Sequence, residues 1–99
     1  MKKMYILVRQ DLDKIYKLVQ GGHGLAQFAL EQPELFREWN NQTIVYLDVC
    51  NEESFNYHEF MLDKNNIKYS IFREPDLGNQ RTAIAYYGEC IFKKLEIAK

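Results

Sequence analysis

Two short runs along the chain are apolar without alternating with polar residues. They are residues 4–8, MYILV, and residues 43–47, TIVYL, in which only the opening threonine is polar. Strands that are buried on both faces have this pattern, and they belong to parallel sheets covered by helices on either side. The mostly helical stretch between the two runs is long enough for a crossover connection between parallel strands.

The crossover stretch contains apolar residues at helical spacing. Leu25, Phe28 and Ala29 recur on one side of a helix and predict a stripe that faces the core. Pro33 is suited to the first turn of a helix, so a second short helical piece is expected to begin there. The connection is therefore predicted to be helical over most of its length.

The second half of the chain predicts one more helix and two more strands. Asn51 is a good N-cap, and Phe55, Glu59 and Leu62 share a face of the helix that follows, which ends at residues 65–66. Strands are expected over residues 67–72 and 82–87. The predicted order is β-α-β-α-β-β, an α/β fold with three layers, α/β/α, on a four-stranded mixed sheet.

The composition fits one small domain that spans residues 1–99. The 99 residues are 46% hydrophobic, and neither a linker nor a repeat divides them. No apolar run has the length of a membrane span, and residues 1–4 lead straight into a strand rather than a signal peptide. Cys50 and Cys90 lack the spacing of metal ligands. We therefore expect a cytoplasmic protein with free thiols, no metal and no cofactor.

Charge is distributed unevenly along the chain. Residues 1–30 carry five basic side chains against two acidic ones, residues 31–63 carry one against eight, and residues 64–99 carry seven against four. The formal net charge is −1, which argues against a protein that coats nucleic acid without specificity, because such binding needs many phosphate contacts. A local anion site near either end stays possible.

Two loops are expected to meet at one edge of the predicted sheet. In open α/β sheets the ligand crevice lies beyond the carboxyl ends of the strands. The loop over residues 10–13 follows the first strand, and the loop over residues 73–80, REPDLGNQ, follows the third. Asp76 in the second loop is either an ordinary turn residue, as Pro-Asp-x-Gly often indicates, or a carboxylate placed for chemistry.

A glycine-rich stretch, residues 20–24 (QGGHG), lies in the crossover. Glycine inside a helix is unfavourable, so either a backbone or a ligand approaches closely there, or a turn joins two short helices. In a continuous helix Tyr16, Gln20 and His23 project from one side, whereas Lys17 lies about 120° from His23. This polar side is a candidate pocket lining.

These residues carry a resemblance to the peptidyl-tRNA hydrolase 2 family. The apolar strand that ends in Val8-Arg9-Gln10-Asp11-Leu12, followed by Gln20-x-x-His23, resembles the family's V-R-x-D-L and K-x-x-x-Q-x-x-H-A segments. Asp76-Leu77-Gly78, followed by Thr82, is similar to its D-A-G-x-T-Q segment and the G-T after it. The resemblance covers most of residues 4–87, in the same order.

The resemblance implies an enzyme that hydrolyses the ester between a peptide and the 3′ end of tRNA without a metal, and that is usually a homodimer. It implies Asp76 as the base or as the residue that orients water, with His23 as the second catalytic residue. The expected substrate-binding or nucleotide-binding residues are Tyr16, Lys17, Gln20, Gly22, Gly78 and Thr82.

The sequence departs from this family at two positions. The family's lysine falls on Tyr16, which cannot supply a cation, and the threonine of D-A-G-x-T falls on Gln80. A second hypothesis follows, a binding protein on the same scaffold that has lost the reaction and sequesters a small nucleotide, for example in viral counter-defence. A third is a scaffold that acts only through protein contacts made by Trp39 and Tyr86-Tyr87.

Overall fold

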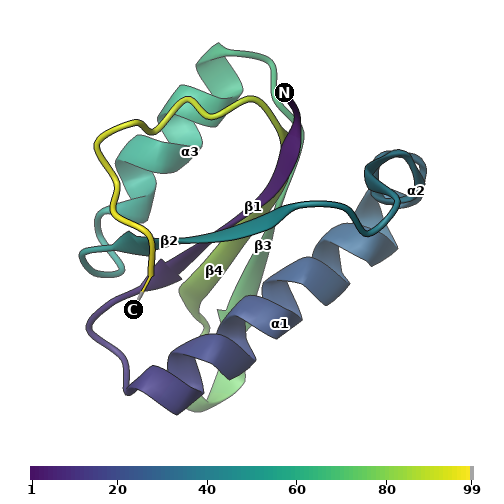
Figure 1. Ribbon diagram of the computed structural model, residues 1–99. Helices are drawn as coiled ribbons and strands as arrows, with labels where there is room; N and C mark the ends of the chain where they lie inside the picture. The colour runs from purple at the N-terminus through teal and green to yellow at the C-terminus, as the bar shows by residue number, and fades with distance from the viewer. Residues whose placement is uncertain (99) are drawn as a thin grey trace.

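The computed structural model describes residues 1–98, which form one four-stranded mixed sheet with helices on both faces (Figure 1). The strands are β1 (Lys3–Arg9), β2 (Ile44–Val49), β3 (Tyr69–Glu74) and β4 (Gln80–Gly88), in the spatial order β2-β1-β4-β3. β1 is parallel to β2 and antiparallel to β4, and β4 is antiparallel to β3. β1, β2 and β3 therefore run in the same direction, and their carboxyl ends lie at the same end of the sheet.

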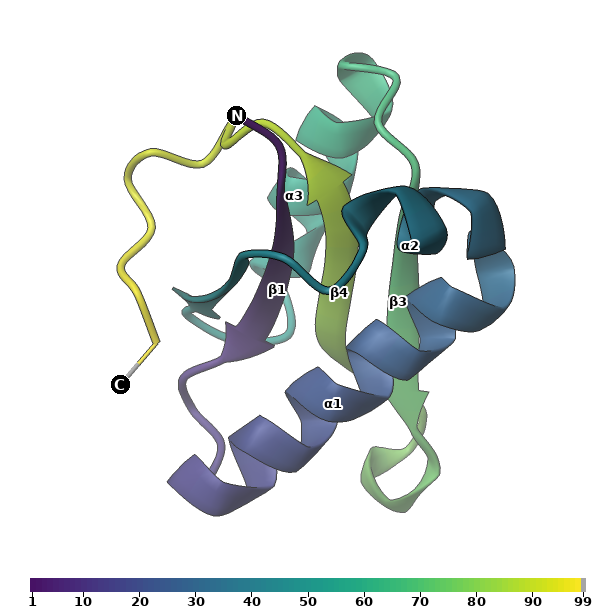
Figure 2. The same cartoon turned by 45° about the vertical axis from the view of Figure 1, so that its right-hand side comes forward.

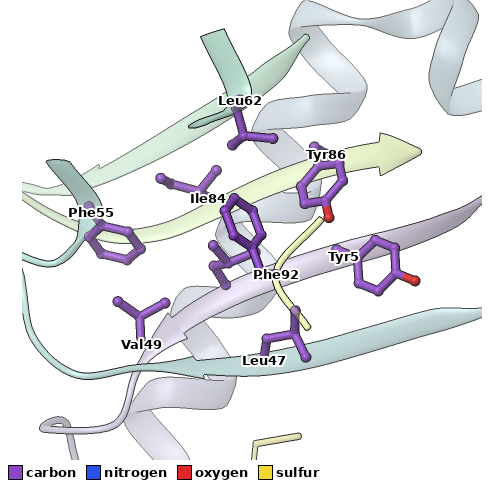
Figure 3. Close-up of a cluster of buried hydrophobic side chains, with 9 residues drawn as sticks. Tyr5, Leu47, Val49, Phe55, Leu62, Ile84, Tyr86 and Phe92 are labelled. Carbon is purple, nitrogen blue, oxygen red and sulfur yellow. The ribbon is translucent and has the colours of Figure 1, made fainter. Parts of the chain in front are cut away.

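The helices form the two outer layers, which confirms the expected three-layer class. α1 (Lys14–Glu31) and α2 (Pro33–Trp39) cover one face of the sheet, and α3 (Phe55–Lys64) covers the other together with the C-terminal segment (Figures 1 and 2). Side chains of β1 alternate between the two layers, with Met4, Ile6 and Val8 on the α1 side. Figure 3 shows the core on the α3 side, which contains Tyr5, Leu7, Leu47, Val49, Phe55, Leu62, Ile84, Tyr86 and Phe92.

β1 is buried along almost its whole length, as its unbroken apolar run predicts. β2 has the same kind of sequence but lies at the edge of the sheet, so Ile44 is exposed and Val45 is half-buried. The C-terminal segment partly covers this edge. The backbone N–H of Asp48 donates to the carbonyl of Glu96 at 2.9 Å, and that of Ala98 donates to the carbonyl of Tyr46 at 2.8 Å.

α3 ends as expected, but the strand after it begins two residues later than predicted. Asn66 has a φ of 57°, and the backbone N–H of Ile67 donates to the carbonyl of Leu62 at 3.0 Å. This pattern is a Schellman motif, which satisfies the last carbonyls of a helix. Ile67 therefore belongs to the helix cap, and β3 begins at Tyr69.

α1 is one continuous helix, so the alternative of two short helices joined by a turn is wrong. Two of its glycines are explained by close packing on the sheet. A Cβ on Gly24 would lie 2.9 Å from the Cβ of Ala83, and one on Gly21 would lie 2.4 Å from the ring of Tyr46. The glycines lie within the helix rather than at its beginning, so they do not form an anion-binding N-terminus.

The aromatic residues proposed for a scaffold interface belong largely to the core. Trp39 is 4% exposed, and its indole N–H donates to the carbonyl of Thr43 at 2.9 Å. Tyr86 is fully buried, and only Tyr87 is half-buried. A protein-contact surface built on these three residues is therefore excluded.

Two further expectations concern the membrane and the thiols. Among residues 1–98 no helix combines the length and the apolar character needed to cross a membrane. Cys50 and Cys90 are free cysteines, the first exposed and the second half-buried.

Candidate functional site

A β-bulge in β4 determines which side chains face α1. Phe72 pairs with Ala83 and Arg73 pairs with Arg81, so Thr82 is an extra residue on β4 with no partner on β3. A bulge of this kind interrupts the regular alternation of side chains and often occurs beside functional sites. Thr82 consequently lies on the α1 side together with Ala83, whereas Arg81 lies on the α3 side.

A chain of hydrogen bonds joins β4, α1 and β3 at this bulge. The Thr82 hydroxyl donates to Oε1 of Gln20 at 2.6 Å, and Nε2 of Gln20 donates to Oε1 of Glu74 at 2.9 Å. Thr82 is fully buried and Gln20 is 1% exposed. An ionised carboxylate can only accept, so Glu74 requires the amide nitrogen of Gln20 and leaves its oxygen for Thr82. The orientation of the amide is therefore determined by the chemistry of its partners.

Glu74, the last residue of β3, is the centre of the site. Its second oxygen accepts the backbone N–H of Asp76 at 3.3 Å. The hydrogen bond from Gln20, followed by the one from the Asp76 N–H, lowers the pKa of Glu74 below the ordinary range of a glutamate. Glu74 is therefore ionised at neutral pH and holds neighbouring groups in place.

Tyr16 and His23 flank the carboxylate from α1. Partial burial and then the negative charge of Glu74 raise the pKa of the Tyr16 hydroxyl, and Asp76 adds a smaller contribution of the same sign. The His23 ring stacks on Phe72 of β3, with the ring centroids 4.5 Å apart and an interplanar angle of 13°. The exposed His23 thus has a defined position beside β3, close enough to Glu74 for a charge on the ring to favour the carboxylate.

Asp76 is exposed in the short 3₁₀ turn Pro75–Leu77 that follows β3. Its carboxylate makes no hydrogen bond or ion pair within residues 1–98, so it is available to water or a ligand. Gly78 closes the turn with a φ of 64°, and its N–H donates to the carbonyl of Pro75 at 3.2 Å. This conformation explains the glycine by turn geometry alone. Figure 2 shows the β3–β4 turn beside α1.

Lys17 and Gly22 do not belong to this constellation. Lys17 is a buried residue of α1, and its side chain points towards the sheet. Its Nζ lies 3.0 Å from Oδ1 of Asp48 on β2. The structure therefore pairs Lys17 with Asp48 rather than with the residues around Glu74, and the expectation that it binds substrate stays a prediction without structural support. Gly22 is exposed on the outer face of α1, and a Cβ there would meet nothing within 4 Å.

Two buried arginines lie at the same end of the sheet, on the face that α3 covers. Arg9 forms two hydrogen bonds with the Asp11 carboxylate, at 3.0 and 2.9 Å. Arg81 pairs with Glu52 and Glu59. Both guanidinium groups form ion pairs with carboxylates, as the ammonium group of Lys17 does, so none of the three supplies a positive charge beside Glu74. No cluster of three His, Cys, Asp or Glu side chains that could hold a metal occurs in residues 1–98.

The structure therefore brings together Tyr16, Gln20, His23, Asp76 and Thr82, and it adds Glu74. Sequence reasoning missed Glu74, although it lies in the REPDLGNQ stretch, directly before the proline. The available signal was its place in the loop expected beyond the carboxyl end of the third strand, where the crevice of an open α/β sheet lies. The bulge that points Thr82 towards Gln20 could not be predicted from the sequence, because residues 80–83 contain no glycine or proline.

Comparisons with known proteins support the fold. No model of a known protein family matches the chain, and no match is found among curated proteins. Among solved structures, the chain is similar to the protein of unknown function Atu0240 from Agrobacterium tumefaciens strain C58. The TM-score is 0.72 at 14% sequence identity, and the match covers 99% of this chain and 98% of the other. The likeness extends over the whole three-layer domain.

Proposed function

We propose that the protein is an esterase of the peptidyl-tRNA hydrolase type, which cleaves the ester between an acyl or peptidyl group and the 3′-terminal ribose of tRNA. The observation that carries the proposal is the hydrogen-bond chain from Thr82 through Gln20 to Glu74, with the unpaired carboxylate of Asp76 beside it. Tyr16 and His23 add an aromatic ring and an imidazole at the same position. The family resemblance at these residues gives the substrate class.

The charge of the site favours this substrate over a free nucleotide phosphate. Glu74 and Asp76 are two carboxylates that would repel a phosphate, and Lys17 is committed to Asp48. Phosphate sites in proteins normally supply cations or free backbone N–H groups. The group that reacts at the 3′ end of tRNA is an uncharged ester on a ribose, which two carboxylates, an amide and hydroxyls can approach without repulsion, whereas the phosphate of that nucleotide lies on the far side of the ribose, at its 5′ oxygen.

The chemistry follows from the availability of Asp76. A water molecule held by the Asp76 carboxylate attacks the ester carbonyl carbon and gives a proton to that carboxylate. The bond between the carbonyl carbon and the ribose oxygen then breaks, and the ribose oxygen takes up the proton that Asp76 had accepted, which regenerates the carboxylate. The hydroxyl of Tyr16, which lies beside Glu74 and Asp76, would donate a hydrogen bond to the oxyanion that develops. Both oxygens of Glu74 accept hydrogen bonds, so this residue positions its neighbours. No cofactor is required.

The test is hydrolysis of an N-acetylated aminoacyl-tRNA. We expect the wild-type protein to release the acylated amino acid, and Asp76→Asn to lower the rate about a hundredfold or more, the usual scale for loss of a general base. Asp13→Asn is the matched control, because Asp13 is also exposed at this end of the molecule, before α1. Equal rates for wild type and Asp76→Asn would remove Asp76 from the mechanism. A substrate of this kind also implies that the protein acts in the cytoplasm.

A second candidate function is binding of an adenosine moiety without turnover. It is favoured by the two rings, Tyr16 and the Phe72-stacked His23, on which a base can stack. Adenosine would then raise the melting temperature, since a ligand of the native state stabilises it. A rise with adenosine but no hydrolysis of acylated tRNA would select this candidate over the esterase.

A further inference from the structure

A pocket lies between α3 and the C-terminal segment, residues 89–98, which runs beside that helix (Figure 1). Its volume is about 290 Å³, at the low end of the range for small-molecule sites. Tyr57 and His58 of α3 form one wall, and residues 91–95 form the other. None of these residues belongs to the site around Glu74, so the pocket is separate from that site.

His58 is the unusual residue of this pocket, because it is a polar side chain among aromatic ones. It is 6% exposed, and its ring packs edge to face with that of Phe92, with the centroids 4.8 Å apart. Its Nδ1 is buried and has no hydrogen-bond partner within residues 1–98. A buried polar group without a partner is unfavourable, and an apolar side chain could fill the same space. Packing alone therefore does not account for a histidine here.

The protonation of His58 determines what its ring can offer to a ligand. Burial lowers the pKa of His58, so the imidazole is neutral at neutral pH. A neutral imidazole has its proton on one of the two nitrogens. Since Nδ1 has no acceptor beside it, the proton is better placed on Nε2. The Nε2–H group is then a hydrogen-bond donor that the ring can present to the pocket.

The other wall supplies positive charge and apolar surface. Lys93 and Lys94 are exposed, and the part of the chain that the structure describes adds no Asp or Glu to the lining. Ile91, Phe92 and Leu95 contribute apolar side chains. Ammonium groups and an imidazole N–H only donate hydrogen bonds, so they fit a negatively charged acceptor such as a carboxylate. The apolar side chains fit the body of the same molecule.

We propose that this pocket is a second binding site, independent of the esterase site, which takes a small carboxylate with an apolar or aromatic body. The carboxylate accepts a hydrogen bond from Nε2 of His58 and pairs with the ammonium groups of Lys93 and Lys94. The apolar body lies against Tyr57 and Phe92. A nucleotide fits less well, because its ribose and phosphates need polar partners over most of their length, whereas most of this wall is apolar.

NMR titration tests the site, because the chain has only two histidines and their imidazole resonances can be told apart. The probe is phenylacetate at neutral pH, with phenylacetamide as its uncharged analogue and acetate as the anion without a ring. We expect phenylacetate to shift the resonances of the His58 ring and of the backbone amides of residues 91–95. The dissociation constant should be on the order of 1 mM for so small a ligand. Phenylacetamide and acetate should each bind about fivefold more weakly or worse.

The combined variant Lys93→Gln and Lys94→Gln tests the recognition of charge. It should weaken the binding of phenylacetate about fivefold or more, and the fold should be retained because both side chains are exposed. Lys64→Gln combined with Lys68→Gln is the matched control. It removes the same charge from two exposed lysines that do not line this pocket, so the affinity should stay unchanged.

His58→Leu separates binding from packing. It should weaken the binding of phenylacetate about fivefold or more, followed at the amides of residues 91–95. Its stability in urea should equal or exceed that of the wild type, because leucine leaves no buried nitrogen without a partner. A purely structural histidine would lower stability when it is replaced and leave the affinity of the folded protein unchanged, and that result overturns the proposal.

The remaining outcomes also decide the question. Saturable shifts at His58 that weaken in the Lys93 and Lys94 variant, but not in its control, support the proposal. No saturable shift at ten times the expected dissociation constant overturns it. Equal affinity for phenylacetate and phenylacetamide overturns it, because charge then plays no part. Shifts confined to His23 also overturn it, because the probe then binds beside Glu74.

Discussion

The hydroxyl oxygen of Thr82 lies 2.6 Å from the side-chain oxygen of Gln20, although 62 positions separate the two residues in the chain. The contact exists because the bulge in β4 places Thr82 on the α1 side of the sheet. It connects the buried end of β4 to Glu74 through a single amide group. The position of the candidate site therefore depends on packing between α1 and the sheet.

Thr82→Val should destabilise the protein by about 1–3 kcal/mol, the range for a buried polar group that loses its partner. Valine has nearly the shape of threonine, but it leaves Oε1 of the buried Gln20 without a donor. Urea unfolding at neutral pH measures the difference. Thr82→Ser keeps the hydroxyl and should recover most of the loss. Equal stability of the valine variant and the wild type would show that the hydrogen bond is unimportant for the fold.

The layers of this fold could be predicted from the sequence because a strand that is buried on both faces consists of consecutive apolar residues. The unbroken apolar run of β1 predicted a strand covered on both faces, and β1 is the strand that lies between β2 and β4. A loop was expected over residues 73–80, but the structure confines it to residues 75–79, because β3 extends to Glu74 and β4 begins at Gln80. The end of α3 at residues 65–66 followed from asparagines that tolerate a positive φ.

The details of the site could not be obtained in the same way. A helical angle places Lys17 about a third of a turn from His23, but it does not say that Asp48 of a distant strand accepts its charge. Glu74 gains its central role only from the hydrogen bonds of Gln20 and the Asp76 backbone. Such contacts depend on tertiary packing between distant parts of the chain, so they cannot be predicted from the spacing of residues along the sequence.

Gly24→Ala and Gly22→Ala should change stability in opposite directions. The new Cβ at position 24 would lie 2.9 Å from the Cβ of the buried Ala83, so α1 must move away from the sheet. We expect a cost of about 1–3 kcal/mol, typical of overpacking. At position 22 the Cβ meets nothing, and the better helix propensity of alanine should add up to about 1 kcal/mol.

Thermal and urea unfolding of both glycine variants, at a protein concentration low enough to keep the chain monomeric, measure the two effects. A stabilised Gly24→Ala variant would mean that α1 can shift on the sheet without losing contacts. A destabilised Gly22→Ala variant would contradict the open surroundings at that position.

Asp48→Asn should be strongly destabilising because it leaves the ammonium group of Lys17 buried without a counter-charge. Only 7% of the Lys17 side chain and 13% of the Asp48 side chain are exposed. Breaking one partner of a buried pair typically costs about 3–5 kcal/mol. Lys17→Met combined with Asp48→Leu replaces the pair by apolar groups of similar size, and we expect it to recover much of that loss.

A double-mutant cycle by urea unfolding checks this prediction, with Lys17→Met and Asp48→Leu as the single variants. Additive effects of the two substitutions would show that the ion pair contributes no coupling energy. Lys17→Met should also leave the hydrolysis rate of folded protein unchanged, because Lys17 does not reach Glu74. A large fall in that rate without loss of folded protein would return Lys17 to the list of site residues.

The ion pair between Glu52 and Arg81 should make stability depend on pH in the acid range. The hydrogen bond from Arg81 lowers the pKa of Glu52 to about 2 in the folded protein, against 4.5 for an unperturbed glutamate. Because the unfolded chain binds this proton first, the stabilisation is present above pH 4.5 and is lost as the pH falls towards 2. We expect about 1–2 kcal/mol from this pair, after allowance for solvent screening.

Glu52→Gln removes the titrating group, so its stability should decline less steeply than that of the wild type between pH 5 and about 3. Urea unfolding across that range measures the two slopes. Glu53→Gln is the control, because Glu53 is exposed and forms no ion pair within residues 1–98. Its slope should match the wild type, because Glu53 takes no part in the ion pairs of Arg81. Parallel curves for all three proteins would mean that Arg81 holds Glu52 no more tightly than water does.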